Sequence, residues 1–69
     1  MLGKNIRAAR ERKGLTQKEV AESIGMNRVN YVRLESGTKI PSLSMTITIA
    51  KLLGCSIDKL VEEEMANHD

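Results

Sequence analysis

Two arginines and two valines of the segment 28–36 have side chains that suit the recognition of base pairs. If this segment is a helix, with about 100° between successive residues, Arg28, Val29, Val32 and Arg33 lie on one side of it, together with Ser36. An arginine can donate two hydrogen bonds to O6 and N7 of guanine, and an apolar side chain can pack against the methyl group of thymine. This face therefore suits contact with base edges in the major groove of duplex DNA.

Other side chains around this segment suit the phosphate backbone. Asn27 directly precedes the segment, Gln17 stands where an earlier helix is expected to begin, and Lys39 follows in a loop. Amide side chains, lysines and free amides at helix N-termini all bind phosphate oxygens. We expect Gln17, Asn27 and Lys39 to contact phosphate rather than bases.

The sequence contains few residues that could form a catalytic site. The only histidine, His68, stands in the C-terminal tail, and Cys55 has no histidine nearby in the sequence to activate it. No zinc-ligand spacing, glycine-rich phosphate loop or carboxylate cluster is present, and the run 62–64 of three glutamates reads as a solvated helix end. We expect no enzymatic activity, cofactor, metal or small-molecule substrate.

Length and charge indicate one small domain whose first half is basic. We expect the 69 residues of the chain to form one domain, residues 1–69. Residues 1–40 carry nine Lys/Arg and four Asp/Glu, a net charge of +5, whereas residues 41–69 have a net charge of −3. A basic half favours an anionic partner. The sequence has no apolar run long enough for a membrane span. Its single cysteine excludes an internal disulfide, so we expect a reducing compartment, the cytoplasm.

Five helices are expected from their end signals. Thr16 and Glu19 have the spacing of a capping box, with Leu15 and Val20 as a hydrophobic staple. Asn27 and Ser42 are further N-cap candidates, and a glycine follows each of the first four helical segments. The predicted helices are about 2–13, 17–24, 28–36, 43–53 and 57–65.

The fourth of these helices is the ambiguous one. Residues 45–49 alternate and are rich in β-branched side chains, which favours a strand. We predict a helix because Ser42 and Gly54 frame the segment and no second strand is available to pair with it. The expected core stripe is Leu43, Ile47, Ala50 and Leu53, with a second apolar stripe of Met45, Ile49 and Leu52.

The second and third helices are separated by only Gly25, Met26 and Asn27. Two helices joined by such a short turn containing glycine cross steeply. The small side chain of Ala21, one turn before Gly25, lets the third helix approach. This spacing predicts a helix-turn-helix, whose second helix enters the major groove.

The same residues carry a family resemblance that covers nearly the whole chain, from about residue 2 to residue 63. The sequence resembles the lambda repressor/Cro-like (Xre-type) helix-turn-helix family in these residues: Gly14-Leu15-Thr16-Gln17, Ala21, Ile24-Gly25-Met26-Asn27, Leu34-Glu35-Ser36-Gly37, Pro41-Ser42, Ala50 and Leu53-Gly54-Cys55-Ser56-Ile57. The resemblance implies an all-α, compact five-helix domain with its helix-turn-helix at the second and third helices. It also implies a bacterial or phage-encoded transcriptional regulator, in most cases a repressor, that binds a palindromic operator as a homodimer.

The resemblance also assigns roles to individual residues. Base reading falls on Arg28, Val29 and Arg33, and an ion pair between the first and third helices falls on Arg10 and Glu35. Many members have polar residues at the two valine positions, which places more of the hydrogen bonding on the arginines. Many members have an apolar residue at the position of Thr46.

Two questions stay open at this level. Dimerisation could use the fourth and fifth helices through Ile57, Leu60 and Val61, but these residues could equally close the core of the monomer. The alternative function is a protein-interaction module, such as an antitoxin-like or antirepressor-like domain, whose exposed valines Val29 and Val32 bind protein.

Overall fold

The computed structural model describes the backbone of residues 2–66 and the side chains of residues 2–61, so His68 and the side chains of the glutamates at 62–64 lie outside it. The described residues form five helices and no strand, which confirms the all-helical prediction. The helices are α1 (Leu2–Lys13), α2 (Gln17–Ser23), α3 (Arg28–Ser36), α4 (Leu43–Leu53) and α5 (Ile57–Ala66). α2 ends one residue before the predicted bound, because Ile24 is its C-cap, and α5 ends one residue later.

The predicted N-caps are present. The Thr16 hydroxyl accepts a hydrogen bond from the Glu19 amide at 3.0 Å, and the Glu19 carboxylate accepts one from the Thr16 amide at 2.8 Å, which completes a capping box. The Asn27 side chain accepts from the Val29 amide at 2.8 Å, and the Ser42 hydroxyl accepts from the Met45 amide at 3.1 Å. These local bonds explain why α2, α3 and α4 begin where they do.

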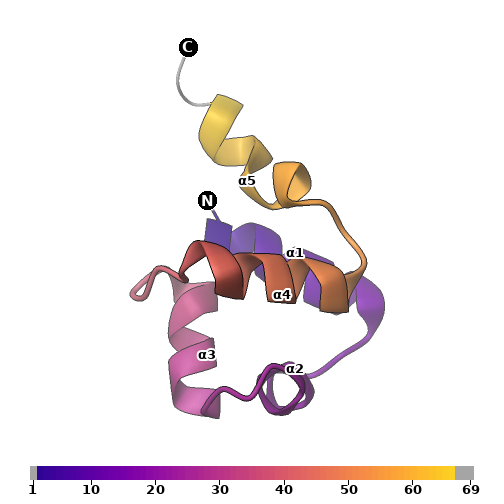
Figure 1. The fold of residues 1–69 in the computed structure, drawn as a ribbon, viewed down its shortest axis with the longest axis vertical. Coiled ribbons are helices and arrows are strands. Elements are labelled where there is room, and N and C mark those ends of the chain that lie inside the picture. Colours follow the sequence, from indigo (N-terminus) through magenta and orange to yellow (C-terminus); the bar gives the residue numbers. More distant parts are fainter. Residues whose placement is uncertain (1, 67–69) are drawn as a thin grey trace.

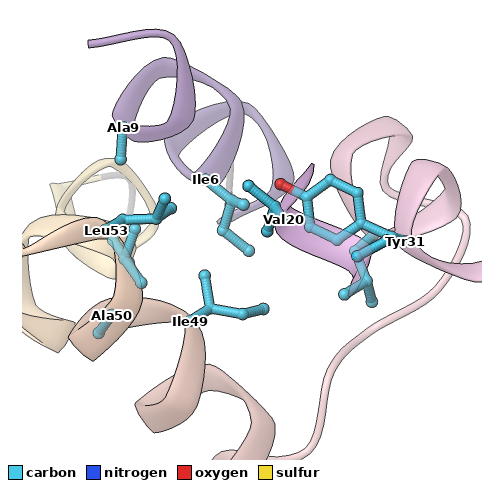
Figure 2. Packing of buried hydrophobic residues seen from close by; sticks show 10 residues of the cluster. Ile6, Ala9, Val20, Tyr31, Ile49, Ala50 and Leu53 are labelled. Atoms are coloured by element: carbon cyan, nitrogen blue, oxygen red, sulfur yellow. The ribbon is translucent and has the colours of Figure 1, made fainter. Parts of the chain in front are cut away.

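α1 lies at the centre of the molecule, where it contacts α3, α4 and α5, while α2 packs against α3 (Figure 1). α2 and α3 form one end of the molecule and α5 lies at the other (Figure 1). The core between the helices is apolar, and Figure 2 shows side chains from α1, α2, α3 and α4 converging in it. Its buried members are Ile6, Ala9, Val20, Ala21, Tyr31, Leu34, Ile49, Ala50, Leu53 and Leu60.

Gly3 allows α1 to approach the end of α3 closely. The residue is buried, and a Cβ atom placed on it would collide with the carbonyl oxygen of Leu34 and lie 2.7 Å from that of Glu35. Any larger side chain would therefore push α1 away from the backbone of α3. This contact sets the position of α3 relative to the rest of the core.

The predicted core stripe of α4 is wrong in two of its four residues. Ala50 and Leu53 are buried, but Leu43 and Ile47 are exposed, and Thr46 and Ile49 face the core in their place. Burial of Thr46 is possible because its hydroxyl donates a hydrogen bond to the Ser42 carbonyl oxygen at 2.9 Å. α4 is thus rotated about its axis so that the stripe 46, 49, 50, 53 lies inward.

None of the helices in the described part of the chain is both long enough and apolar enough to cross a membrane. Cys55, in the turn between α4 and α5, is half-buried and packs against the core as a free thiol.

Candidate nucleic-acid interface

The turn between α2 and α3 is built around Gly25. This glycine has a φ of +70°, which side-chain-bearing residues rarely adopt, and the amide of Met26 donates to the Ala21 carbonyl oxygen at 2.8 Å. Ala21 is itself buried, so α3 can pass close to α2 at this point. The geometry is that of two short helices joined by a tight turn, with α3 following α2 at a steep angle (Figure 1).

α3 has one face in the core and one face directed outward. Tyr31 and Leu34 are buried in the core, whereas Arg28, Val29 and Arg33 are exposed. Val29 has 60% of its surface exposed, so this apolar side chain is available to contact a partner. The outward face therefore carries two guanidinium groups and one apolar side chain.

Val32, the fourth residue predicted to read bases, is half-buried and therefore less accessible than predicted. It lies at the border between the outward face and the core. We therefore expect a smaller base contact from Val32 than from Arg28, Val29 or Arg33.

The residues predicted to bind phosphate come from three elements next to α3 in the chain. Gln17 begins α2, Asn27 caps α3, and Lys39 lies exposed in the loop that follows α3. An open hollow of about 490 Å³ brings Gln17 and Lys18 of α2 together with Arg28 of α3. Since the Asn27 oxygen is used for capping, its NH2 group is the part that can donate to a phosphate.

A hydrogen-bonded network centred on Glu35 fixes the C-terminal half of α3 against α1 and α2. Arg10 Nε donates to Glu35 Oε2 at 2.7 Å and its Nη2 donates to Oε1 at 3.2 Å, an ion pair with only 12% and 4% of the two side chains exposed. Tyr31 Oη donates to Glu35 Oε2 at 2.5 Å, and Gln17 Nε2 donates to Oε1 at 3.1 Å. Arg10 also donates to the Leu15 carbonyl oxygen at 2.8 Å. One carboxylate thus joins α1, α2 and α3.

The network changes the ionisation of its members. Burial disfavours the charged form of Glu35, but hydrogen bonds from Arg10, Tyr31 and Gln17 outweigh it and hold its pKa below the ordinary value of 4.5. The hydrogen bond to Glu35 raises the pKa of Arg10. Burial, with the hydrogen bond to a carboxylate, raises the pKa of Tyr31 well above its ordinary value of 10.0. At neutral pH the network therefore contains Arg10 as a cation, Glu35 as an anion and a neutral Tyr31.

We expect Tyr31 to resist ionisation until the protein unfolds. The folded pKa exceeds the unfolded value of 10.0, so the stability that Tyr31 contributes is complete below pH 10 and is lost as the pH rises above it. Since Tyr31 is the only tyrosine and the chain has no tryptophan, tyrosinate absorbance reports on this group alone. An alkaline titration followed by absorbance and circular dichroism should show tyrosinate and loss of helix together. Ionisation near pH 10 with the helices intact would contradict the network.

Sequence reasoning paired Arg10 with Glu35 but missed Tyr31 and Gln17 as partners of the same carboxylate. Tyr31 and Glu35 are four residues apart on one helix, a spacing that places side chains next to each other. That spacing was a usable signal. The Gln17 contact joins residues 18 apart in the sequence and depends on how α2 packs against α3.

The residues suggested for dimerisation lie at the other end of the molecule. Leu60 has 1% of its surface exposed and belongs to the core, where it closes the monomer. Ile57 packs against that core, and Val61 is half-buried. α5 therefore offers a second subunit parts of Ile57 and Val61 but very little of Leu60.

No group of three or more His, Cys, Asp or Glu side chains lies within metal-binding reach among the described residues. Buried side-chain nitrogen and oxygen atoms in this part of the chain all have hydrogen-bond partners.

Comparison with known proteins gives several similar transcriptional regulators. The chain is 36% identical to the cryptic phage CTXphi transcriptional repressor RstR of Vibrio cholerae, over 100% of this chain and 62% of that protein. It is 33% identical to the HTH-type transcriptional regulator YqaE of Bacillus subtilis, over 93% of this chain and 55% of that protein. It is 35% identical to the antitoxin PezA of Streptococcus pneumoniae, over 97% of this chain and 43% of that protein. The chain thus spans about two-fifths to three-fifths of the length of these relatives.

The helix-turn-helix family HTH_3 matches residues 6–60, which include all of α2, α3 and α4 and the turns between them. The matched region contains the glycine turn, the outward face of α3 and the network around Glu35. The chain belongs to the helix-turn-helix family, in its lambda repressor-like (Xre) branch.

Proposed function

We propose that this protein is a transcriptional repressor that binds a palindromic operator in duplex DNA as a homodimer, with α3 in the major groove. The observation that carries this proposal is the outward face of α3, where Arg28, Val29 and Arg33 are exposed while Tyr31 and Leu34 anchor the helix in the core. A helix presented in this way can enter a groove about 12 Å wide without unfolding its own domain.

Charge and family membership support the same proposal. The basic residues of the chain are concentrated in residues 1–40, which include α2, α3 and Lys39. RstR is described as a transcriptional repressor, and YqaE as an HTH-type transcriptional regulator. We place the protein in the cytoplasm, with its DNA.

Selection of bound sequences from random duplex DNA tests the proposal directly. We expect enriched sites with two inverted half-sites whose centres lie about 34 Å apart, one helical turn. Sites without inverted symmetry would contradict a two-fold dimer. Failure to enrich any sequence at low salt would contradict specific DNA binding as a whole.

Lys39→Ala tests the role assigned to the loop after α3. Because a phosphate contact carries no sequence information, the variant should bind selected and random duplexes more weakly by similar factors. The slope of log affinity against log salt should fall in magnitude by about 0.9 for each copy bound. Fluorescence anisotropy over a range of salt concentrations measures both quantities. Weaker binding to the selected site alone would instead assign Lys39 to base reading.

The second candidate is a protein-interaction module. The exposed Val29 favours it, as does the likeness to a protein described as an antitoxin. Recognition of a protein through valines would depend weakly on salt, whereas DNA binding depends on it steeply. The salt series described for Lys39→Ala therefore separates the two candidates.

A further inference from the structure

Val29 is the most exposed apolar side chain of α3, and it stands between two arginines. With about 100° between successive residues, Arg28 lies on one side of Val29 around the helix and Arg33 lies on the other. Val29 and Arg33 are also four residues apart, so their side chains are neighbours along the helix. A base pair that Val29 touches therefore lies beside the base pairs within reach of the two guanidinium groups.

Val29 offers a partner its two methyl groups and no polar group. Its amide could otherwise donate to a base or a phosphate, but it donates to the Asn27 side chain at 2.8 Å as part of the N-cap of α3. The valine side chain itself has neither a donor nor an acceptor. The part of a base that Val29 recognises must therefore be apolar.

The apolar group that the major groove presents is the methyl group on C5 of thymine. Cytosine carries hydrogen at C5 and an amino group at C4, whereas thymine carries an oxygen at C4. A methyl group added to C5 of cytosine gives 5-methylcytosine, which presents the same apolar surface in the same place. Because Val29 has no polar atom with which to compare the groups at C4, it responds to the methyl group and not to the identity of the base.

The polar groups around Val29 do not favour the amino group of a base either. Arg28 and Arg33 can only donate, so they favour the acceptors O6 and N7 of guanine. The Asn27 oxygen accepts from the Val29 amide, and the Ser36 hydroxyl donates back to the Arg33 carbonyl oxygen at 3.1 Å. Both of these oxygen atoms thus take part in bonds within the protein. The exposed face of α3 is therefore built to select guanines and C5-methyl groups.

We infer that Val29 reads the C5-methyl group of a pyrimidine, so that the affinity of the protein for a site depends on whether the DNA is methylated at that base. This inference rests on the proposed function, because it requires α3 in the major groove. Thymine and 5-methylcytosine both satisfy Val29, whereas unmodified cytosine leaves it without an apolar contact. Methylation of a cytosine at this position of a site then raises the occupancy of that site by the protein.

The test exchanges single methyl groups in the duplex that selection enriches. Because unmethylated DNA carries a C5-methyl group only on thymine, we expect a constant thymine in each half-site. Replacing it by uracil removes the methyl group alone and should weaken binding by about 4-fold for each half-site, the effect of exposing one such group. With a cytosine–guanine pair at the same position, methylation of the cytosine should tighten binding by a similar factor. Fluorescence anisotropy measures both ratios.

Two variants of the protein show which side chain senses the methyl group. Val29→Ala should bring the thymine-to-uracil ratio and the 5-methylcytosine-to-cytosine ratio close to one. Val32→Ala is the matched control, because it makes the same change three residues further along α3 at a half-buried position, and it should keep both ratios. Val29 lies outside the core cluster, so Val29→Ala should leave the melting temperature almost unchanged.

Several outcomes would overturn the inference. These are a selected half-site without a constant thymine, equal binding to the thymine and uracil duplexes, and a thymine effect with no matching effect of 5-methylcytosine. Ratios lost in Val32→Ala and kept in Val29→Ala would assign the methyl group to Val32, and ratios kept in both variants would show that the methyl group acts through the DNA alone. Failure of the unaltered protein to select any sequence would instead refute the proposed function, so the two failures are distinct.

Discussion

Glu35→Ala should lower the free energy of unfolding by about 3–5 kcal/mol, the usual cost of removing one partner of a buried ion pair. The substitution leaves the Arg10 cation with 12% of its side chain exposed and no carboxylate to meet it. It also removes the acceptor for the hydroxyl of Tyr31 and for the amide of Gln17. A domain of this length has a total stability of only about 3–10 kcal/mol, so the loss is a large part of it.

Thermal unfolding followed by circular dichroism measures this effect as a fall in melting temperature of about 12 °C or more. The matched control is Glu11→Ala, because Glu11 pairs with Arg7 at 3.5 Å on the surface, where 57% and 63% of the two side chains are exposed. Glu11→Ala should change the free energy of unfolding by no more than about 0.5 kcal/mol. Arg10→Met/Glu35→Leu should recover part of the loss, because it leaves no buried charge without a partner, although the Tyr31 hydroxyl still lacks its acceptor. A melting temperature unchanged by Glu35→Ala would show that the ion pair does not brace α3.

Arg33→Ala should weaken binding to the selected operator by about 1–3 kcal/mol, or roughly 5- to 150-fold, for each half-site. Arg33 is exposed on the outward face of α3, where its guanidinium can reach the edge of a guanine. Binding to random duplex should change much less, so the ratio of specific to random affinity should fall. Repeating the selection with Arg33→Ala should show relaxed preference at one position of each half-site.

Lys59→Ala is the matched control for charge, because it removes one positive charge from α5, at the end of the molecule opposite α2 and α3 (Figure 1). It should leave operator selectivity unchanged. Equal losses on operator and random duplex for Arg33→Ala would show that Arg33 binds phosphate. Arg28→Ala, at the start of α3 and on the rim of the hollow that contains Gln17, separates the same two roles for that arginine.

The five helices and their ends could be predicted from the sequence because the signals that set them are local. The capping box of Thr16 and Glu19 and the cap at Asn27 act through bonds that span two or three residues. The turn at Gly25 depends only on the backbone conformation of that residue. The same local reasoning placed Arg28, Val29 and Arg33 together on one side of α3, because the period of one helix fixes which side chains share a face, and the structure exposes all three.

Local pattern could not decide the rotation of α4 or the full set of contacts to Glu35. α4 carries apolar residues on more than one side, so its own period allows either stripe to face inward, and the fit of Thr46 and Ile49 against the other helices made the choice. Gln17 reaches Glu35 only because α2 packs against α3, and Gly3 matters only because α1 meets the backbone of α3. Each of these features depends on the distance between helices, which no single segment of the chain encodes.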